Sequence, residues 1–141
     1  MKVFWFQSIN FAILEPKNNF TLEDNKRANQ VIRNIVNDLE QNGIIYNTLS
    51  ENLKKLREHA VAEQKPVVAK ALRLAFEHLD EFETFAAPIP TEDEYDEENP
   101  PEKITGTESM LYFINLIKKP GNPINKQELR SYIAFLEDFS I

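Results

Sequence analysis

The chain has 141 residues, a formal net charge of −7, 42% hydrophobic residues and no cysteine. This length suits one domain that buries roughly two-thirds of its unfolded surface, and the hydrophobic content excludes a chain that is disordered throughout. The lack of cysteine excludes disulfides, a thiol nucleophile and a thiolate metal site. Because no apolar run approaches membrane-spanning length and no signal-peptide cleavage pattern follows the N-terminus, we expect a cytoplasmic protein.

Residues 2–14 are rich in aromatic and β-branched side chains and end shortly before Pro16. This composition favours a short β-strand. A buried N-terminal helix is the alternative, because periodicity does not distinguish the two in a run this apolar.

Two helices are predicted next. The first spans residues 22–42, with Thr21 as its N-cap and Gly43 after its end. The second begins at a capping box formed by Thr48 and Glu51 and is broken by Lys65-Pro66. The first has an apolar stripe formed by Ala28, Val31, Ile32, Ile35, Val36 and Leu39. The predicted buried face of the second is Leu49, Leu53, Leu56 and Ala60.

Residues 66–85 predict a third helix, in which polar side chains follow a single stripe and apolar ones cover most of the remaining circumference. A helix that is apolar around most of its surface is usually surrounded by other helices. We therefore expect this helix to be the most buried element and the centre of the fold.

Two more helices are predicted after residue 104. The pairs Thr105–Glu108 and Asn125–Glu128 have capping-box spacing, and the turn signal Pro120-Gly121-Asn122-Pro123 separates the two helices. Their apolar faces are Met110, Leu111, Phe113, Ile114 and Ile117, and Leu129, Tyr132, Ile133, Leu136 and Phe139. The prediction is a single mostly α, five-helix bundle-like domain: residues 1–87 form the N-terminal segment and three-helix core, and residues 105–141 form a helix pair docked on it.

The segment between these parts, residues 88–104, is an acidic connector. Residues 88–102 contain four of the eight prolines and seven carboxylates but no Lys, Arg or Gly. The rest of the chain is balanced, with 11 basic and 12 acidic residues in 1–90 and 5 and 4 in 103–141. The whole net charge therefore lies in residues 91–102, which we expect to be extended and solvated.

The two histidines offer little for metal binding. His59 and Glu63 are four residues apart, and His78 and Glu81 are three apart. A helical di-iron site needs a Glu three residues before each His, whereas here those positions hold Leu and Ala. We expect no metal and no cofactor.

Catalytic motifs are also lacking. None of the five serines lies in a Gly-x-Ser-x-Gly elbow, and Ser50 and Ser109 are interpreted as first-turn helix residues. Three glycines do not provide a phosphate cradle, and the dense carboxylates lie in a solvated tract that does not suit acid–base catalysis. We expect the protein not to be an enzyme.

The predicted function is a non-catalytic protein-interaction module, such as an inhibitor, an immunity- or antitoxin-like protein, or an adaptor. Its acidic tract would steer a basic protein partner. The predicted partner-binding residues are Glu92, Asp93, Glu94, Tyr95, Asp96, Glu97 and Glu98.

Two alternative functions are kept. One is a nucleic-acid-associated regulator acting through the C-terminal helix pair, which carries Lys118, Lys119, Lys126 and Arg130. Against it, the net charge of residues 103–141 is only +1, and the nearby acidic tract would repel a duplex. The other is a small-molecule sensor with a Phe-rich helical pocket.

Overall fold

The structure is a computed structural model that describes residues 24–91, 97–100 and 102–139. Five helices follow one another: α1 (Lys26–Asn42), α2 (Tyr46–Ala62), α3 (Pro66–Phe82), α4 (Thr107–Lys118) and α5 (Pro123–Phe139). The predicted mostly helical fold is confirmed, and the described residues contain no strand. The expected N-terminal strand or helix, residues 2–14, lies outside them. None of these five helices is both long and apolar enough to span a membrane.

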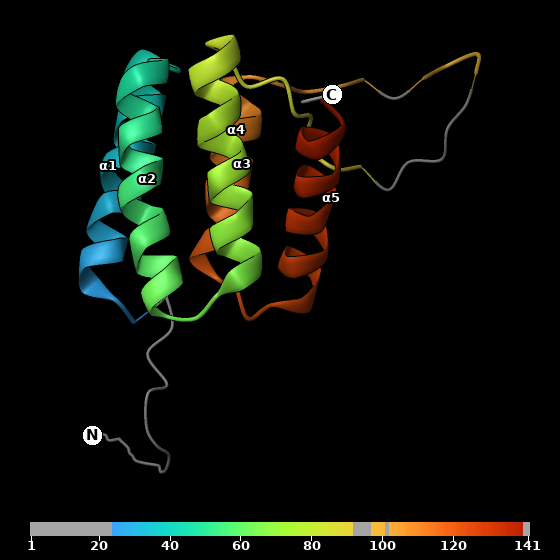
Figure 1. The fold of residues 1–141 in the computed structure, drawn as a ribbon. Helices are drawn as coiled ribbons and strands as arrows, with labels where there is room; N and C mark the ends of the chain where they lie inside the picture. The colour runs from blue at the N-terminus through green and yellow to red at the C-terminus, as the bar shows by residue number, and fades with distance from the viewer. Residues whose placement is uncertain (1–23, 92–96, 101, 140–141) are drawn as a thin grey trace.

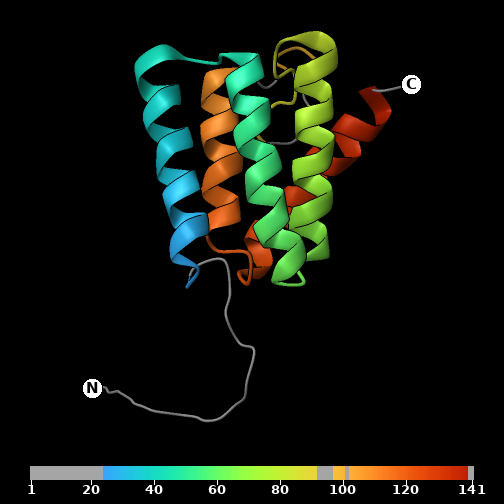
Figure 2. The ribbon, with the colours of Figure 1, turned by 60° about the vertical axis from the view of Figure 1, so that its left-hand side comes forward.

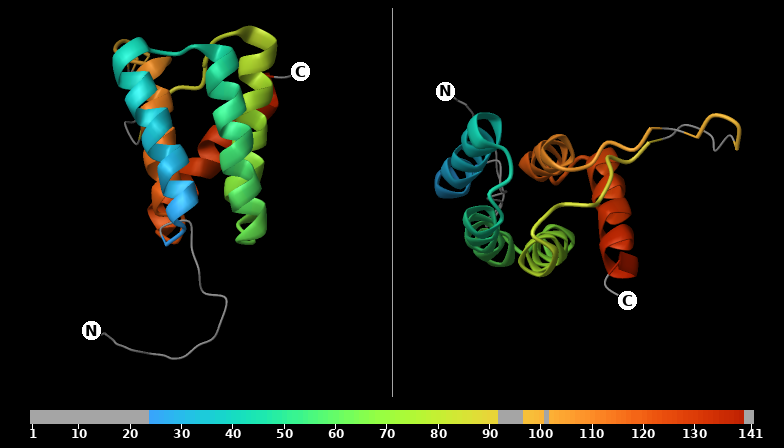
Figure 3. Two further views of the ribbon diagram at one scale, coloured as in Figure 1. Left: turned by 90° about the vertical axis from the view of Figure 1, so that its left-hand side faces the viewer. Right: turned by 90° about the horizontal axis from the view of Figure 1, so that it is seen from above.

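The five helices close into a ring. α1 packs against α2, α2 against α3, α3 against α5, α5 against α4, and α4 against α1. Figure 3 shows this ring from above. Figure 1 and Figure 2 show that the axes of α1 to α4 are nearly aligned, whereas the axis of α5 crosses them obliquely. α5 therefore packs on α3, whereas α4 packs mainly on α1 and α5.

Apolar side chains from all five helices fill the interior of the ring. On α2, the four residues predicted to be buried are all at most 3% exposed. α3 has eight buried residues, more than any other helix, but the shorter α4 buries six of its twelve. The central role that the sequence assigns to residues 66–85 alone is therefore shared by α3 and α4.

Two helices begin after an asparagine. Asn25 Oδ1 accepts a hydrogen bond from Ala28 N–H (3.0 Å), so α1 begins at Lys26 and not at residue 22. Asn122 Oδ1 likewise accepts from the N–H groups of Ile124 (2.9 Å) and Asn125 (3.2 Å) at the start of α5. The predicted Asn125–Glu128 capping box is wrong, because Pro123 begins α5 two residues earlier, where its missing N–H is not needed. The predicted N-cap Thr21 lies outside the described residues.

The other two predicted capping boxes are also wrong. α2 begins at Tyr46, so Thr48 and Glu51 lie inside the helix, and α4 begins at Thr107, beyond Thr105. Neither helix has a side-chain cap. Gly106, which precedes α4 with a φ of +74°, donates its N–H to Phe85 O (2.9 Å). The start of α4 is therefore set by contact with a distant segment and not by a local cap.

α3 ends at Phe82, three residues before its predicted end. Glu83 takes the left-handed conformation, with a φ of +60°, and donates its N–H to Leu79 O (2.9 Å). This turn redirects the chain, so that Phe85 enters the core with no exposed surface. Phe85 is thus buried as a residue of the following segment and not as part of α3.

Candidate functional sites: an acidic arm and a basic groove

Residues 88–104, called the acidic arm below, are held at their base by backbone pairing. Ile89 N–H donates to Ile104 O (2.9 Å), and Gly106 N–H donates to Phe85 O (2.9 Å), so the incoming and outgoing chains run antiparallel. Phe85 and Ala87, just before the arm, have no exposed surface. The base of the arm is therefore fixed to the end of the bundle where α3 ends and α4 begins.

A buried polar network joins this base to α4 and α5. Ser109 Oγ donates to Ala87 O (2.6 Å) and lies 2.9 Å from Tyr132 Oη, and Tyr132 Oη donates to Ser109 O (3.1 Å). Ser109 and Tyr132 are at most 1% exposed. Burial, the main cause, raises the pKa of Tyr132 above its ordinary value, although the hydrogen bond with Ser109 opposes the shift. Tyr132 therefore stays a neutral hydrogen-bonding group in this network.

The sequence interpretation of Ser109 missed this role. Ser109 lies in the first turn of α4, as predicted, but its side chain faces the core. A signal was present, because Ser109 lies four residues before Phe113 and so falls on the apolar stripe of its helix. A hydroxyl on an apolar stripe needs a buried hydrogen-bond partner.

The described parts of the arm extend away from the bundle. Its incoming and outgoing flanks leave together beside α5 (Figure 1, Figure 3). Of the predicted partner-binding residues, Glu97 and Glu98 are exposed on the outgoing flank. Glu102, a further acid of the arm, is exposed closer to the base. The remaining predicted residues lie outside the described residues: Glu92, Asp93, Glu94, Tyr95 and Asp96.

The structure does not bring the two histidines together. α2 and α3 pair through a short turn, which places His59 near the turn end of the pair and His78 near the opposite end. Asn25 Nδ2 donates to His59 Nδ1 (3.3 Å) and to Glu63 Oε1 (3.5 Å). Within the described part of the chain, no group of three or more His, Cys, Asp or Glu side chains is placed to hold a metal. His59 and Glu63 instead fix the start of α1 against the end of α2.

His78 is enclosed in an aromatic cluster at the end of α3. Its ring centroid lies 4.9 Å from those of Phe82 and Phe139 and 6.1 Å from that of Phe85. Ala86 N–H donates to His78 Nε2 (3.2 Å), so Nε2 must be unprotonated there. Burial lowers the pKa of His78 below its ordinary value of 6.5, although the charge of Glu81 opposes this.

We expect the free energy of unfolding to fall as the pH drops below 6.5. The unfolded chain takes up a proton near the ordinary pKa of histidine, whereas the folded chain binds one only at lower pH, so acid favours unfolding in this window. One such group contributes at most about 1.4 kcal/mol per pH unit. Urea denaturation at several pH values between 5.5 and 7.5 measures the effect.

The control for this prediction is the second histidine. His78→Gln should flatten the dependence on pH, whereas His59→Gln keeps His78 and should retain it. The same pH dependence in His78→Gln as in the unaltered protein would contradict the assignment.

A groove of about 540 Å³ lies on the outer face of α2 and α3, near the turn that joins them. It is lined by Arg57, Val61, Gln64, Lys65, Pro66, Ala69, Lys70 and Arg73. Four of these side chains are cationic and none is acidic. This basic groove is a local concentration of positive charge on a protein whose net charge is −7.

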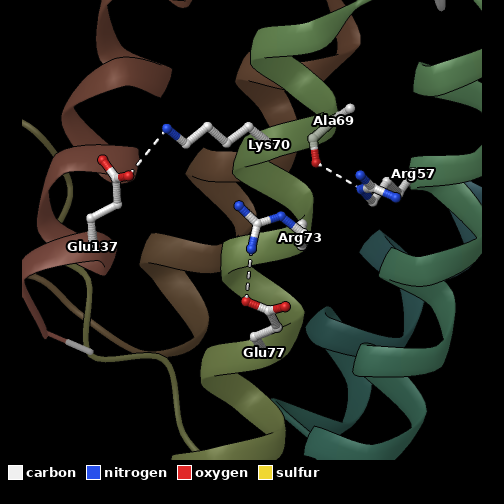
Figure 4. Close-up of polar contacts among 6 residues, drawn as sticks. All are labelled: Arg57, Ala69, Lys70, Arg73, Glu77 and Glu137. Carbon is white, nitrogen blue, oxygen red and sulfur yellow. Dashed lines mark hydrogen bonds and ion pairs between the residues drawn. The ribbon is translucent and has the colours of Figure 1, made fainter. Parts of the chain in front are cut away.

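Three of the cations are held in place by neighbouring groups (Figure 4). Arg57 Nε donates to Ala69 O (3.1 Å), which fixes the guanidinium between α2 and α3. Lys70 Nζ lies 3.1 Å from Glu137 of α5, and Arg73 Nη1 lies 3.1 Å from Glu77. The side chains of both ion pairs are 39–53% exposed, and pairs this exposed contribute at most about 1 kcal/mol.

The remaining charge in the groove is not matched by a neighbouring acid. Among the described residues, neither Arg57 nor Lys65 has a carboxylate within 4.0 Å. The two terminal NH₂ groups of Arg57 also have no hydrogen-bond partner in this part of the chain. Planar guanidinium groups with free donors favour carboxylate or phosphate ligands. The groove is therefore suited to an anionic partner, and sequence reasoning did not find it.

The features behind the two alternative functions are placed as follows. Lys118 and Lys119 lie exposed at the end of α4, and Lys126 and Arg130 lie exposed on α5. The Phe-rich interior is packed: the rings of Phe85, Phe113 and Tyr132 are in mutual contact, with centroids 5.1–6.0 Å apart.

Comparisons with protein-family models, with curated proteins and with solved structures found no match to this chain.

Proposed function

We propose that the protein is a non-catalytic interaction module that presents its acidic arm to a basic surface of a partner protein. Inhibitors, immunity- or antitoxin-like proteins and adaptors belong to this class. The observation that carries the proposal is the fixed base of the arm. The buried residues before it, the backbone pairing across it and the Ser109–Tyr132 network hold the ends of the arm on the bundle.

This arrangement supports electrostatic steering for a simple reason. Outside residues 91–102 the chain has equal numbers of basic and acidic residues, so the arm creates the charge asymmetry of the molecule. Glu97 and Glu98 are exposed on a flank that extends away from the helices (Figure 1). Concentrated exposed charge raises the rate at which an oppositely charged partner associates, more than it raises the final affinity.

Neutralising the arm should slow association with the partner by about tenfold or more at low salt. The arm variant replaces six acids with the matching amides: Glu92, Asp93, Glu94, Asp96, Glu97 and Glu98. The partner is first captured with the unaltered protein and identified by mass spectrometry. Surface plasmon resonance across a salt series then measures both rates. The association rate should lose most of its salt dependence, and the dissociation rate should change less.

A matched control separates the effect of the arm on the association rate from the effect of net charge. It replaces six exposed acids on the helices and the turn after α3 with amides: Glu40, Glu51, Glu58, Glu81, Glu83 and Asp138. Both variants raise the formal charge from −7 to −1. The control should associate nearly as fast as the unaltered protein. If both variants associate equally slowly, the slower association is due to net charge and not to the arm. If the arm variant associates as fast as the unaltered protein, the arm does not steer the partner and is only a spacer.

A further inference from the structure

We propose that the basic groove binds the acidic arm of a second copy of this chain, so that copies associate head to tail. The inference rests on the proposed function because it again takes the acidic arm as the contacting element. What it adds is the basic surface that the arm contacts. The two elements are complementary in charge: residues 91–102 contain seven acids and no base, and the groove is lined by four cations and no acid.

The groove has charge available for such a ligand. Arg57 is oriented by its bond to Ala69 O, and its terminal NH₂ groups remain free within the described part of the chain. Lys65 has no ion pair with a described acid. The ion pairs of Lys70 and Arg73 are exposed, so carboxylates of an incoming arm can replace Glu137 and Glu77 at little cost.

The position of the arm favours a second copy over the same chain. The arm starts where α3 ends, whereas the groove lies around the first two turns of α3. The described flanks of the arm leave the bundle beside α5 and point away from α2 (Figure 1, Figure 3). The arm of the same chain therefore points away from the groove, whereas the arm of another copy can lie along it.

Net charge does not prevent this association. Two copies of charge −7 repel each other only to the extent that their arms are close, because the remainder of each chain is balanced. In a head-to-tail contact, the arm of one copy faces the groove of the other and the second arm points elsewhere. Contact brings opposite charges close together, whereas the second arm stays farther away, where its repulsion is weaker and is partly screened by salt. We therefore expect the attraction at contact to outweigh the repulsion between arms.

Sedimentation equilibrium of the full chain at low and high salt tests the proposal. The unaltered protein should show a mass that rises above the monomer with concentration in 25 mM salt and returns toward the monomer in 500 mM salt. A groove variant replaces Arg57, Lys65, Lys70 and Arg73 with Gln. This variant and the arm variant described above should each self-associate at least about tenfold more weakly. A control variant with Arg33, Lys55, Lys118 and Lys119 replaced by Gln removes the same charge elsewhere and should keep the association.

Mixing the two variants gives the decisive result. The groove variant retains an intact arm and the arm variant retains an intact groove, so a mixture should form a one-to-one pair although neither associates alone. Such pairing also shows that both variants are folded. A monomeric unaltered protein at low salt would overturn the inference, as would undiminished self-association of the groove variant.

Other outcomes separate this inference from the proposed function. If the unaltered protein stays monomeric while its captured partner still requires the arm, only the second-copy proposal falls. If the groove retains a single-stranded oligonucleotide at low salt while the chain stays monomeric, the groove binds nucleic acid and the second-copy proposal is wrong. If the arm variant both self-associates and binds its partner like the unaltered protein, both proposals fall.

Discussion

Replacing Phe85 with alanine is expected to lower the free energy of unfolding by about 3–5 kcal/mol. Phe85 has no exposed surface, and its ring contacts those of His78, Phe113 and Tyr132. Truncating it removes buried apolar area and leaves a cavity that these surrounding rings fill only in part. Because Phe85 O accepts the hydrogen bond from Gly106 N–H, the loss of packing should also loosen the base of the acidic arm.

Two measurements check this prediction. Urea denaturation gives the change in the free energy of unfolding, and amide hydrogen exchange at Gly106 reports on the base of the arm. Phe82→Ala is the matched control, because Phe82 is 38% exposed and lies just before the same turn. It should cost clearly less and leave exchange at Gly106 unchanged. Equal costs for the two variants would contradict the anchoring role of Phe85.

The helices could be predicted from the sequence because their apolar side chains repeat at the helical period. Leu49, Leu53, Leu56 and Ala60 were predicted to be buried and are. The helix starts could not be predicted as well. The capping-box spacing recurs by chance in polar segments, whereas the start of α4 depends on a hydrogen bond between Gly106 and Phe85, which are far apart in the chain.

The acidic arm was visible as a run of charge, but its anchoring was not. Residues 88–104 were predicted to be an extended, solvated connector. Nothing local indicates that Ile89 pairs with Ile104, because that contact exists only once α3 and α4 are placed in the ring. The same holds for the bond from Ser109 Oγ to Ala87 O, although the position of Ser109 on an apolar stripe was a usable signal.

The basic groove could have been found from residue spacing. Arg57 and Arg73 lie eight residues before and eight residues after Lys65, and Lys65-Pro66 was recognised as the break between two helices. If the helices fold back on each other there, these two cations come to a similar height on neighbouring helices. The net charge of residues 1–90 does not reveal the groove, because acidic residues elsewhere in this range balance its cations.

Leu72→Ala is expected to cost about 2–5 kcal/mol, and Leu79→Ala the same, because both side chains are fully buried on α3. α3 packs against α2 on one side and α5 on the other, so a cavity at either position weakens two contacts of the ring. Leu111→Ala is the control, since Leu111 lies on α4 and is only partly buried.

Thermal and urea denaturation of the three variants compare these positions directly. The cost of a truncation grows with the buried apolar surface that it removes and with the volume that the neighbours fail to fill. Because Leu111 is only partly buried, Leu111→Ala should cost less than either substitution on α3. Because native domains are stable by only about 5–15 kcal/mol, a loss of the expected size is a large fraction of the total. A cost of 0.5 kcal/mol or less for Leu72→Ala, the range typical of surface positions, would contradict the placement of Leu72 in the packed core.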